Sequence, residues 1–362
     1  MTVVNLCRME SNPTPSAISD DGPCRMQPMD EDRYELREFR DSDYAAVATL
    51  QKANDPEQPL SPESLRHMFE TILQGSLFRN VAVADRHTQK VVGAGALFRM
   101  PFESDAAHLW LVGGVDPAHQ REGIGSHIYD SLASEARQRG ATTLSCQVLE
   151  SSAPGRGFLA KRGFVERRRS WRSRLEVASA SWSDLPSLAR SLATDRIELT
   201  TLAHEGARNL QVLTRVHGLF TEAAKDVPRD GSYTPMPFDQ FRQFYFEGDN
   251  ALPDAWSLAK FGDRYVAVSQ AAREPARPGV LQQNFTGTLP EFRRRKIGLA
   301  LKLMILQYAK LNGYDRIETS NDSLNVPMWT LNQGLGFRKV RETIQFESQL
   351  SGARSGPSPS PT

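Results

Sequence analysis

The chain has 362 residues, which is long for a single hydrophobic core, and a typical domain length of about 150 residues predicts two domains. Its formal net charge is only +1, so the composition implies no general attraction to nucleic acid or to an anionic membrane surface. The three cysteines, Cys7, Cys24 and Cys146, form no Cys-x-x-Cys pattern and indicate neither a disulfide framework nor a zinc site. A reducing, cytoplasmic location is therefore expected.

The two ends of the chain differ in composition from the rest. Residues 1–32 contain Pro, Ser and Asp and hold no apolar stretch long enough for a signal peptide. No window of the chain approaches the roughly eighteen apolar residues of a membrane span. The tail, 350–362, is rich in Ser, Gly and Pro, and we expect this tail and the arm 1–32 to be disordered.

The first half of the chain is predicted to be β-rich with interspersed helices. Alternation at Tyr34–Glu38 predicts a strand, and Asp41 is expected to cap a helix that runs through Ala53. Ser61 is expected to start a second helix. Apolar residues spaced by four from Ile124 predict a long helix that ends at Gly140. Further strands are expected at 81–84, 91–97, 107–115, 142–149 and 165–177, and a short helix at 154–162.

Residues 178–194 are expected to form a short helical linker, after which the second half follows the same plan. Strands are expected at 197–201, 256–260, 265–271 and 280–288, and a helix at 204–224. The long helix of this half holds seven apolar residues between 299 and 306, on all sides, which is typical of a helix buried on several faces. Each half is thus predicted to be an α/β or α+β layer arrangement.

One pattern occurs twice at a single offset of 173 residues (290 − 117 = 336 − 163 = 173). The matching landmarks are Pro117 and Pro290, Gln120 and Arg293, Gly125 and Gly298, Gly140 and Gly313, and Gly163-Phe164 and Gly336-Phe337. Five landmarks at one spacing, without a gap, predict two copies of one domain.

The repeated turn between strand and helix has a chemical interpretation. In the first copy it reads Gln-x-x-Gly-x-Gly, from Gln120 to Gly125. Glycines let the backbone approach a ligand closely, and the unpaired N–H groups of the first helical turn can bind a pyrophosphate. The pattern is not a Walker loop, because no Gly-Lys-Ser/Thr follows. A turn that needs glycine for steric reasons alone is the alternative.

With its surroundings, this pattern resembles the GNAT superfamily of N-acetyltransferases. The strand, the Val-Asp-Pro step, the turn, the helix and the later Gly-Phe carry the resemblance, which covers about 33–177 and 195–349. It implies two GNAT-type domains, each a mixed, mostly antiparallel splayed sheet flanked by helices. In that family the turn holds the pyrophosphate of acetyl-CoA, and the preceding strand splays away from its neighbour to receive the pantetheine arm. Carried over, the cradle of the first domain is Gln120, Arg121, Gly123, Ile124, Gly125 and Ser126.

The second copy departs from the family pattern. Aligned by Pro290, its turn runs from Arg293 to Gly298 and places Lys296 where the first glycine should be. A shift of two residues would recover a glycine but would break the offset of 173, so we reject it. Asn325, eleven residues before Gly336, matches a family asparagine that contacts the CoA arm, whereas Ser152 stands there in the first copy. The candidate cofactor contacts of the second domain are therefore Arg293, Lys296, Gly298 and Asn325, with a basic surface loop as the alternative.

Catalytic roles receive no assignment from the sequence. The tyrosine acid usual in the family, four residues before the Gly of Gly-Phe, is Leu159 in one copy and Asn332 in the other. Four polar residues are candidates for a base by neighbourhood only, namely His108, Glu150, Glu318 and Asp322. Acidic residues that could receive a cationic amine in the second domain are Asp226, Asp230, Glu247, Asp249 and Asp254, and an aromatic cluster near Phe241 could wall a pocket or form core.

The function predicted from the resemblance is acetyl-CoA-dependent transfer of an acetyl group to a primary amine of a small molecule. Either half could be the catalytic one. The alternative is a degenerate tandem in which one or both copies act as a non-catalytic CoA-binding or structural module. Nucleic-acid binding is a third class, prompted by the basic runs 167–169 and 293–296, and the net charge of +1 argues against it. No metal, membrane or nucleic-acid partner is expected.

Overall fold

The structure, a computed structural model, describes residues 28–350 except 58, 74, 101–102, 104, 229–232, 248–250 and 276. The predicted disordered arm and tail lie outside the described residues, apart from 28–32 and 350. Met29 and Leu350 are buried in the same hydrophobic core, so ordered chain extends past both expected boundaries. No helix in the described ranges is long and apolar enough to cross a membrane.

The chain divides into two compact units. The C-unit comprises Ser170–Glu342, and the N-unit contains the chain up to Arg169 together with the segment from Thr343 onward. The boundary therefore passes through two long strands, β6 (Val165–Glu176) and β12 (Arg338–Gln349).

The N-unit contains five strands of its own besides the end of β12. They are β1 (Tyr34–Glu38), β2 (Leu77–Asp85), β3 (Val91–Phe98), β4 (His108–Val115) and β5 (Thr143–Leu149). Its helices are α1 (Tyr44–Asn54), α2 (Pro62–His67), α3 (Ile124–Gln138) and α4 (Ala153–Ala160), with short turns η1 (Asp41–Asp43), η2 (Met68–Ile72) and η3 (Pro117–His119). The strand order is β1-β2-β3-β4-β5-β12, and only the β4–β5 pair is parallel.

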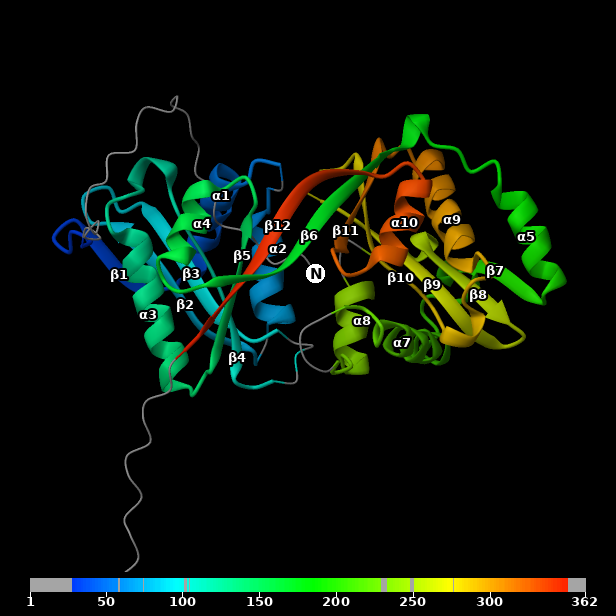
Figure 1. Cartoon of the computed structure of the whole chain (residues 1–362), viewed down its shortest axis with the longest axis horizontal. Coiled ribbons are helices and arrows are strands. Elements are labelled where there is room, and N and C mark those ends of the chain that lie inside the picture. Colours follow the sequence, from blue (N-terminus) through cyan, green and yellow to red (C-terminus); the bar gives the residue numbers. More distant parts are fainter. Residues whose placement is uncertain are drawn as a thin grey trace, which may run out of the picture. The chain divides into compact units, whose positions relative to one another are not determined.

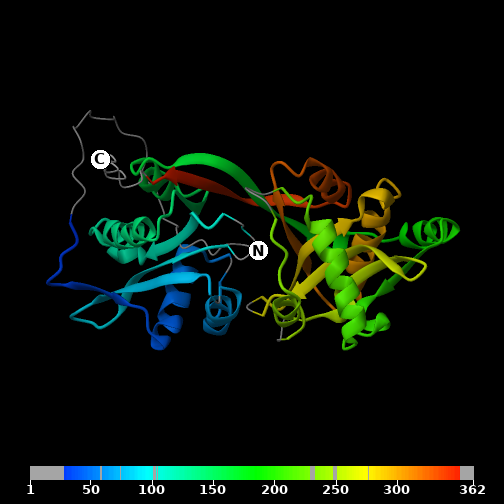
Figure 2. The ribbon, with the colours of Figure 1, turned by 90° about the horizontal axis from the view of Figure 1, so that it is seen from below.

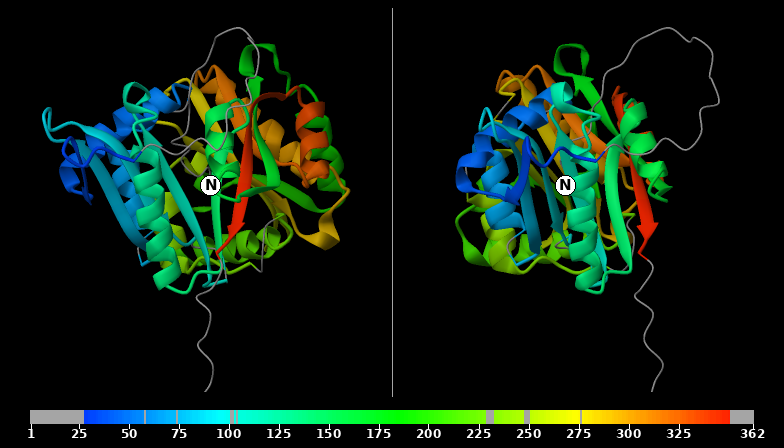
Figure 3. Two further views of the ribbon diagram at one scale, coloured as in Figure 1. Left: turned by 60° about the vertical axis from the view of Figure 1, so that its left-hand side comes forward. Right: turned by 90° about the vertical axis from the view of Figure 1, so that its left-hand side faces the viewer.

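Helices cover both faces of the N-unit sheet (Figures 1 and 2). The helix α3 runs along the strands on one face (Figure 3), where Ile128 and Leu132 belong to a core cluster that also contains residues of β2, β4 and β5. Gly95 on β3 allows this close approach, since a Cβ there would come 2.6 Å from the Ile128 side chain. The helices α1 and α2 pack on the opposite face against a second cluster that includes Trp110 and Val112.

The C-unit repeats this plan. Its strands are β7 (Ile197–Thr201), β8 (Trp256–Phe261), β9 (Arg264–Arg273), β10 (Val280–Thr288) and β11 (Arg316–Asp322), in the order β6-β11-β10-β9-β8-β7. Its helices are α5 (Leu185–Thr194), α6 (Leu202–Glu205), α7 (Leu210–Ala224), α8 (Phe238–Phe246), α9 (Ile297–Leu311) and α10 (Val326–Gly334). The short turns are η4 (Val177–Ser179), η5 (Pro253–Ala255) and η6 (Pro290–Phe292). Here only the β10–β11 pair is parallel.

The two units exchange their last strands. In the N-unit, β5 pairs antiparallel with Thr343–Gln349 of β12, and in the C-unit, β11 pairs antiparallel with residues 170–176 of β6. The expected boundaries, 33–177 and 195–349, place β6 in the first domain and β12 in the second. In the structure, β6 instead pairs with β11 of the C-unit and β12 pairs with β5 of the N-unit. The exchange changes the energy of backbone hydrogen bonding little, because the edge of either sheet offers each strand the same N–H and C=O partners.

The offset of 173 extends through whole elements. The helices α3 and α9 begin at Ile124 and Ile297, and the helices α4 and α10 begin at Ala153 and Val326. The predicted mixed, mostly antiparallel sheets flanked by helices are confirmed, and so is the helix in the linker, α5.

Two local predictions are wrong. The helix expected at 204–224 is two helices, because Gly206 adopts φ +107° and ends α6, after which Asn209 caps α7. Asp41 does not cap the first helix, because Asp43 accepts the backbone N–H of Arg40 at 2.8 Å and Asp41 forms an ion pair with Arg66 instead. The predicted cap at Ser61 is confirmed, since its side chain accepts the N–H of Ser64.

Candidate functional site

The strands β4 and β5 separate partway along their length. They pair at three positions, from His108 with Thr143 to Trp110 with Ser145, although β4 continues to Val115 and β5 to Leu149. In the C-unit, β10 and β11 pair at four positions and then separate in the same way. The predicted splay is therefore present in both units.

A pocket that is partly open to solvent occupies the splay of the N-unit. It is lined by the diverging parts of β4 and β5, by α3 and α4, and by Asn54 of α1; the lining residues that matter below are Gln120, Gly125, Tyr129, Cys146, Gln147 and Leu159. Its walls are mainly apolar, as is usual for sites that hold a cofactor or another small ligand. The pocket reaches Gly125, at the start of α3, so a long ligand could lie in the splay with one end at this helix N-terminus.

The turn that leads into α3 has the conformation that the sequence predicts. Arg121 and Gly123 adopt φ +68° and +80°, and α3 begins at Ile124 with Gly123 at its N-cap. Gln120 donates from Nε2 to the backbone oxygen of Val115 at 3.2 Å, so its side chain ties the turn to the end of β4. The N–H groups in the first turn of this 15-residue helix point out of its N-terminus and favour an anion.

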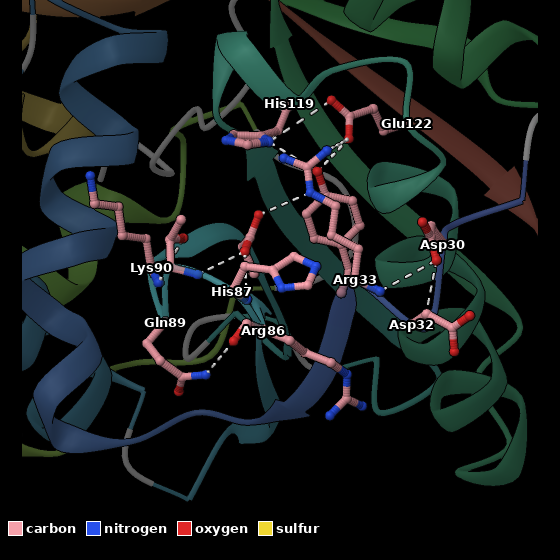
Figure 4. Close-up of polar contacts among 12 residues, drawn as sticks. Asp30, Asp32, Arg33, Arg86, His87, Gln89, Lys90, His119 and Glu122 are labelled. Atoms are coloured by element: carbon pink, nitrogen blue, oxygen red, sulfur yellow. Dashed lines mark hydrogen bonds and ion pairs between the residues drawn. The ribbon is translucent and has the colours of Figure 1, made fainter.

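A polar network holds the turn from the side (Figure 4). Glu122 accepts hydrogen bonds from the Tyr34 hydroxyl and, at 3.4 Å, from Arg33, which also pairs with Asp85 at 3.0 Å. The Tyr34 hydroxyl also lies 3.0 Å from Nδ1 of His119. Burial and the hydrogen bond to Glu122 raise the pKa of Tyr34 to about 12. The turn is thus fastened to β1 by a tyrosine that stays protonated.

Ser126 and Arg162 meet beside the same helix start. Arg162 donates from Nη2 to the Ser126 hydroxyl at 2.8 Å and stacks over the ring of Phe158 at 3.6 Å. Burial lowers the pKa of Arg162. Arg162 was not singled out by the sequence, and it places a guanidinium next to the predicted cradle, where Arg121 is exposed.

The turn of the C-unit has the same backbone path with different residues. Arg294 and Lys296 adopt φ +61° and +60°, at the positions of Arg121 and Gly123, and α9 begins at Ile297. The alignment without a shift is therefore correct. Arg293 donates from Nε to the backbone oxygen of Thr288 at 3.0 Å, as Gln120 does to Val115, and it also pairs with Asp226.

Gly298 and Asn325, the other two candidates of the C-unit, have local roles. A Cβ on Gly298 would meet only ordinary contacts, the nearest at 3.8 Å. Asn325 caps α10 by accepting the N–H of Met328 at 3.3 Å, and Ser152 caps α4 in the same way. The two units therefore share this helix cap. Asn325 differs from Ser152 in that its side chain also carries an NH2 group, which the cap does not use.

The interior of the C-unit differs from that of the N-unit. Lys302 of α9 is 4% exposed and donates to Oε1 of Gln283 on β10 at 2.6 Å. Gln283 in turn donates to Ser269, which shares a hydrogen bond with Thr286 on the separated part of β10. Burial lowers the pKa of Lys302 to about 7. A connected polar network therefore lies between α9 and the splayed strand.

Two of the four polar candidates, Glu318 and His108, lie in buried clusters, whereas Glu150 and Asp322 are half-buried. Glu318 is fully buried and contacts three guanidiniums, those of Arg172 (3.0 Å), Arg174 (2.9 Å) and Arg277 (2.8 Å). Burial opposes ionisation, but the hydrogen bond and charge of Arg277, with the other two arginines, lower the pKa of Glu318 overall. In the N-unit, His108 lies between Ser145 and Glu103. Glu103, which lies between β3 and β4, was not a candidate from the sequence.

Of the acidic residues expected around an acceptor, the structure describes Asp226, Glu247 and Asp254, and the first two form ion pairs. Glu247 pairs with Arg242, and Asp254 lies in the turn η5. Asp230 and Asp249 lie outside the described residues. Phe241 is 1% exposed and packs among other aromatic rings, so it forms core. Leu159 lines the pocket, and Asn332 is buried with its amide on Asn321 at 3.0 Å.

Comparisons with known proteins agree with this geometry. Residues 38–164 match the model of the acetyltransferase (GNAT) family. A GCN5-related N-acetyltransferase from Sphaerobacter thermophilus superposes with a TM-score of 0.64 at 16% identity, covering 88% of this chain and 96% of its own. A tandem GNAT protein from the clavulanic acid biosynthesis pathway superposes with a TM-score of 0.67 at 18% identity, covering 90% and 100%. No curated protein sequence matches significantly.

Residues 38–164 therefore carry a domain of the acetyltransferase (GNAT) family, and the chain as a whole has the fold of a tandem GNAT protein. The family model identifies its first half directly, and the shared fold of the solved structures extends over the second half.

Proposed function

We propose that the protein transfers an acetyl group from acetyl-CoA to a primary amine of a small molecule, and that the N-unit carries out the transfer. The observation that supports this is the pocket in the splay of β4 and β5, which runs to Gly125 at the start of α3. The pantetheine arm would lie in the pocket, and Gln120, Arg121, Gly123, Ile124, Gly125 and Ser126 would surround the pyrophosphate. A cytoplasmic location and a small-molecule partner belong to the same proposal.

For the C-unit we propose a non-catalytic role. Lys302, Gln283 and the hydroxyls bonded to Gln283 occupy the interior next to the splay, where the N-unit has its pocket. A thioester arm that entered there would have to displace a connected polar network and leave its members unpaired, at a cost of roughly 1–3 kcal/mol for each group. The exposed basic turn, Arg293 to Lys296, could still attract an anion, so this unit would bind CoA weakly or serve as support.

Paired variants test which unit binds the donor. A Cβ on Gly125 or on Gly298 has room, since its nearest neighbours would be 3.6 Å and 3.8 Å away, so both Gly125→Asp and Gly298→Asp are expected to fold. Calorimetric titration with acetyl-CoA should show at least a roughly tenfold weaker affinity for Gly125→Asp, about 1.4 kcal/mol, because the carboxylate faces the pyrophosphate. Gly298→Asp should bind as the unaltered protein does.

Three results would contradict the proposal in different ways. Absence of binding heat with the unaltered protein at millimolar acetyl-CoA would remove the donor from it. Weaker binding only in Gly298→Asp would assign the donor site to the C-unit. Binding of acetyl-CoA without release of free thiol for any amine of a panel would favour the degenerate tandem in both units.

A further inference from the structure

A buried chain of three side chains stands at the point where β4 and β5 separate. The Ser145 hydroxyl lies 2.7 Å from Nε2 of His108, and Nδ1 of His108 lies 2.7 Å from Oε1 of Glu103. The second carboxylate oxygen of Glu103 accepts the indole N–H of Trp110 at 2.9 Å, and the Trp110 and His108 rings stack with centroids 5.8 Å apart. The chain is therefore fixed in position at both ends.

The carboxylate sets the direction of every hydrogen bond in this chain. An ionised Glu103 can only accept, so Nδ1 of His108 carries a hydrogen and donates to it. The other ring nitrogen, Nε2, is then an acceptor and receives the hydrogen of the Ser145 hydroxyl. The Ser145 oxygen is left with lone pairs that can accept a hydrogen bond from a third group.

The chain lies beside the pocket. Trp110 and Ser145 form the last of the parallel pairs, and Leu111 and Cys146, the next residue on each strand, line the pocket. Gln147, which also lines it, is two residues from Ser145 and so projects from the same face of the sheet. This is the face covered by α1, opposite to the face covered by α3.

We infer that Ser145, His108 and Glu103 form a proton relay for the acceptor amine. The inference rests on the proposed acetyl transfer in the N-unit. Charged side chains described near it include Glu347, paired in register with Ser145, and Arg167, whose Nε lies 2.8 Å from Glu347. Asp105 also lies nearby, and its backbone oxygen accepts the N–H of His108 at 3.3 Å. Ser145 is fully buried and His108 is 6% exposed, so bulk water competes little with the transfer along the chain.

The step balances in the following way. The ammonium group of the acceptor gives its first proton to the Ser145 oxygen through one water molecule, while the hydroxyl hydrogen of Ser145 passes to Nε2 of His108. The free amine attacks the thioester carbonyl, so that an N–C bond forms; as the C–S bond breaks, the nitrogen gives its second proton to the departing sulfur. CoA leaves as the thiol, and the imidazolium, held by the Glu103 carboxylate, returns the first proton to solvent. An alkylamine, with a pKa of about 10.4, is mostly protonated at neutral pH and needs such a relay.

Among the described residues of the C-unit, the positions equivalent to His108 and Ser145 form no such relay. Residue 281, at the position of His108, is Leu281, and the position of Ser145 holds Glu318, which is occupied by three arginines. The hydrogen-bonded pair of His108 and Ser145 is therefore not repeated at the offset of 173.

The test compares two acceptor amines from the panel used to establish activity: an alkylamine, protonated at pH 7, and a weakly basic aromatic amine or hydrazide, neutral at pH 7. Ser145→Ala removes only one oxygen atom and should lower kcat for the alkylamine by roughly 100-fold, within the range of general acid–base effects. The loss for the weakly basic amine should be at least ten times smaller, and the KM for acetyl-CoA should not change. His108→Gln and Glu103→Gln should show the same pattern, and His87→Gln, in an exposed turn, is the matched control.

Equal losses for both amines would show that Ser145 has only a structural role and would overturn the relay. If the variants fail to fold, the unaltered protein decides. If the relay exists, the acidic limb of the plot of kcat against pH lies well below the pKa of each alkylamine and has the same midpoint for a series of alkylamines. If the midpoint instead follows the pKa of the amine, the relay is overturned. Absence of acetyl-CoA binding is a separate result, read by calorimetry, and contradicts the proposed function itself.

Discussion

Lys302 occupies in α9 the position that Tyr129 occupies in α3, 173 residues earlier (302 − 129 = 173). Tyr129 lines the pocket of the N-unit, with its ring against Phe158 and Phe164, whereas Lys302 is buried and bonded to Gln283. One substitution at one helix position thus separates an apolar pocket wall from a buried amine. This difference is the clearest physical reason to assign different roles to the two units.

The burial of Lys302 should make the stability of the protein depend on pH. Its pKa falls from 10.5 in the unfolded chain to about 7 in the folded state, because burial penalises the ammonium. Between these two values the unfolded state binds more protons, so stability rises with pH from about 7 to 10.5. Lys302→Met removes this dependence. The variant should have a higher free energy of unfolding than the unaltered protein, and this increase should be larger at pH 6 than at pH 9, by a few kcal/mol at most.

Chemical denaturation at the two pH values measures this difference. Lys310→Met, an exposed lysine on the same helix, is the control and should give the same change at both pH values. A Lys302→Met difference that does not vary with pH would show that the lysine keeps its ordinary pKa in the folded protein.

A second prediction concerns Lys296, which adopts the left-handed conformation that Gly123 adopts in the N-unit. In this conformation a residue with a Cβ destabilises the folded state by roughly 1–2 kcal/mol. Glycine avoids this strain but loses more conformational entropy on folding, so its net advantage is smaller. Lys296→Gly should therefore stabilise the protein by about 0.5–1 kcal/mol, and Gly123→Lys should destabilise it by a similar or larger amount. Denaturant midpoints of the pair measure both, and changes of the same sign would contradict the strain argument.

Much of the candidate site could be predicted because it depends on local geometry. The turn at Gly123 and the helix that begins at Ile124 follow from glycine placement and apolar spacing, and the same offset located Lys296 although it is not a glycine. The splay of β4 from β5 came from the family resemblance, because nothing in the residues of a strand shows where it leaves its neighbour.

Other features depend on long-range contacts and could not be predicted. The strand β6 and the strand β12 have similar patterns, and either could pair with β5 or with β11, so their exchange is invisible in the sequence. Glu103 lies in a loop, and only the folded chain brings it to His108. The break at Gly206 was missed because a glycine within an apolar helical pattern is often tolerated.

A third prediction concerns Glu318 and the three arginines around it. Glu318→Gln should destabilise the protein by roughly 3–5 kcal/mol, because it leaves buried guanidiniums without a counter-charge. Glu318 has a lowered pKa in the folded state, so its contribution is present above the unfolded value of 4.5 and is lost as the pH falls through the lower folded value. Glu176→Gln, an exposed residue of β6, is the control.

Acid titration of stability distinguishes the variants. The unaltered protein should lose stability as the pH falls below 4.5, and Glu318→Gln should lose less over the same range, because it has already lost the interaction. A variant as stable as the unaltered protein at pH 7 would show that the arginines are satisfied without the carboxylate.

A fourth prediction links Tyr34 to the cradle of the N-unit. Tyr34→Phe keeps the buried ring but removes the hydroxyl that bonds Glu122 in the turn, so that Glu122 keeps only longer contacts, from Arg33 and His119. The loss of a hydrogen bond, about 1 kcal/mol, should weaken acetyl-CoA binding roughly fivefold, because the looser turn must be ordered when the ligand binds. Calorimetry measures the affinity. Tyr44→Phe, which alters a tyrosine of α1 in the other core cluster of the same unit, is the control and should bind acetyl-CoA unchanged. If Tyr34→Phe binds equally well, the cradle is preorganised by Gly123 and Gln120 alone, and the network around Glu122 contributes only to folding.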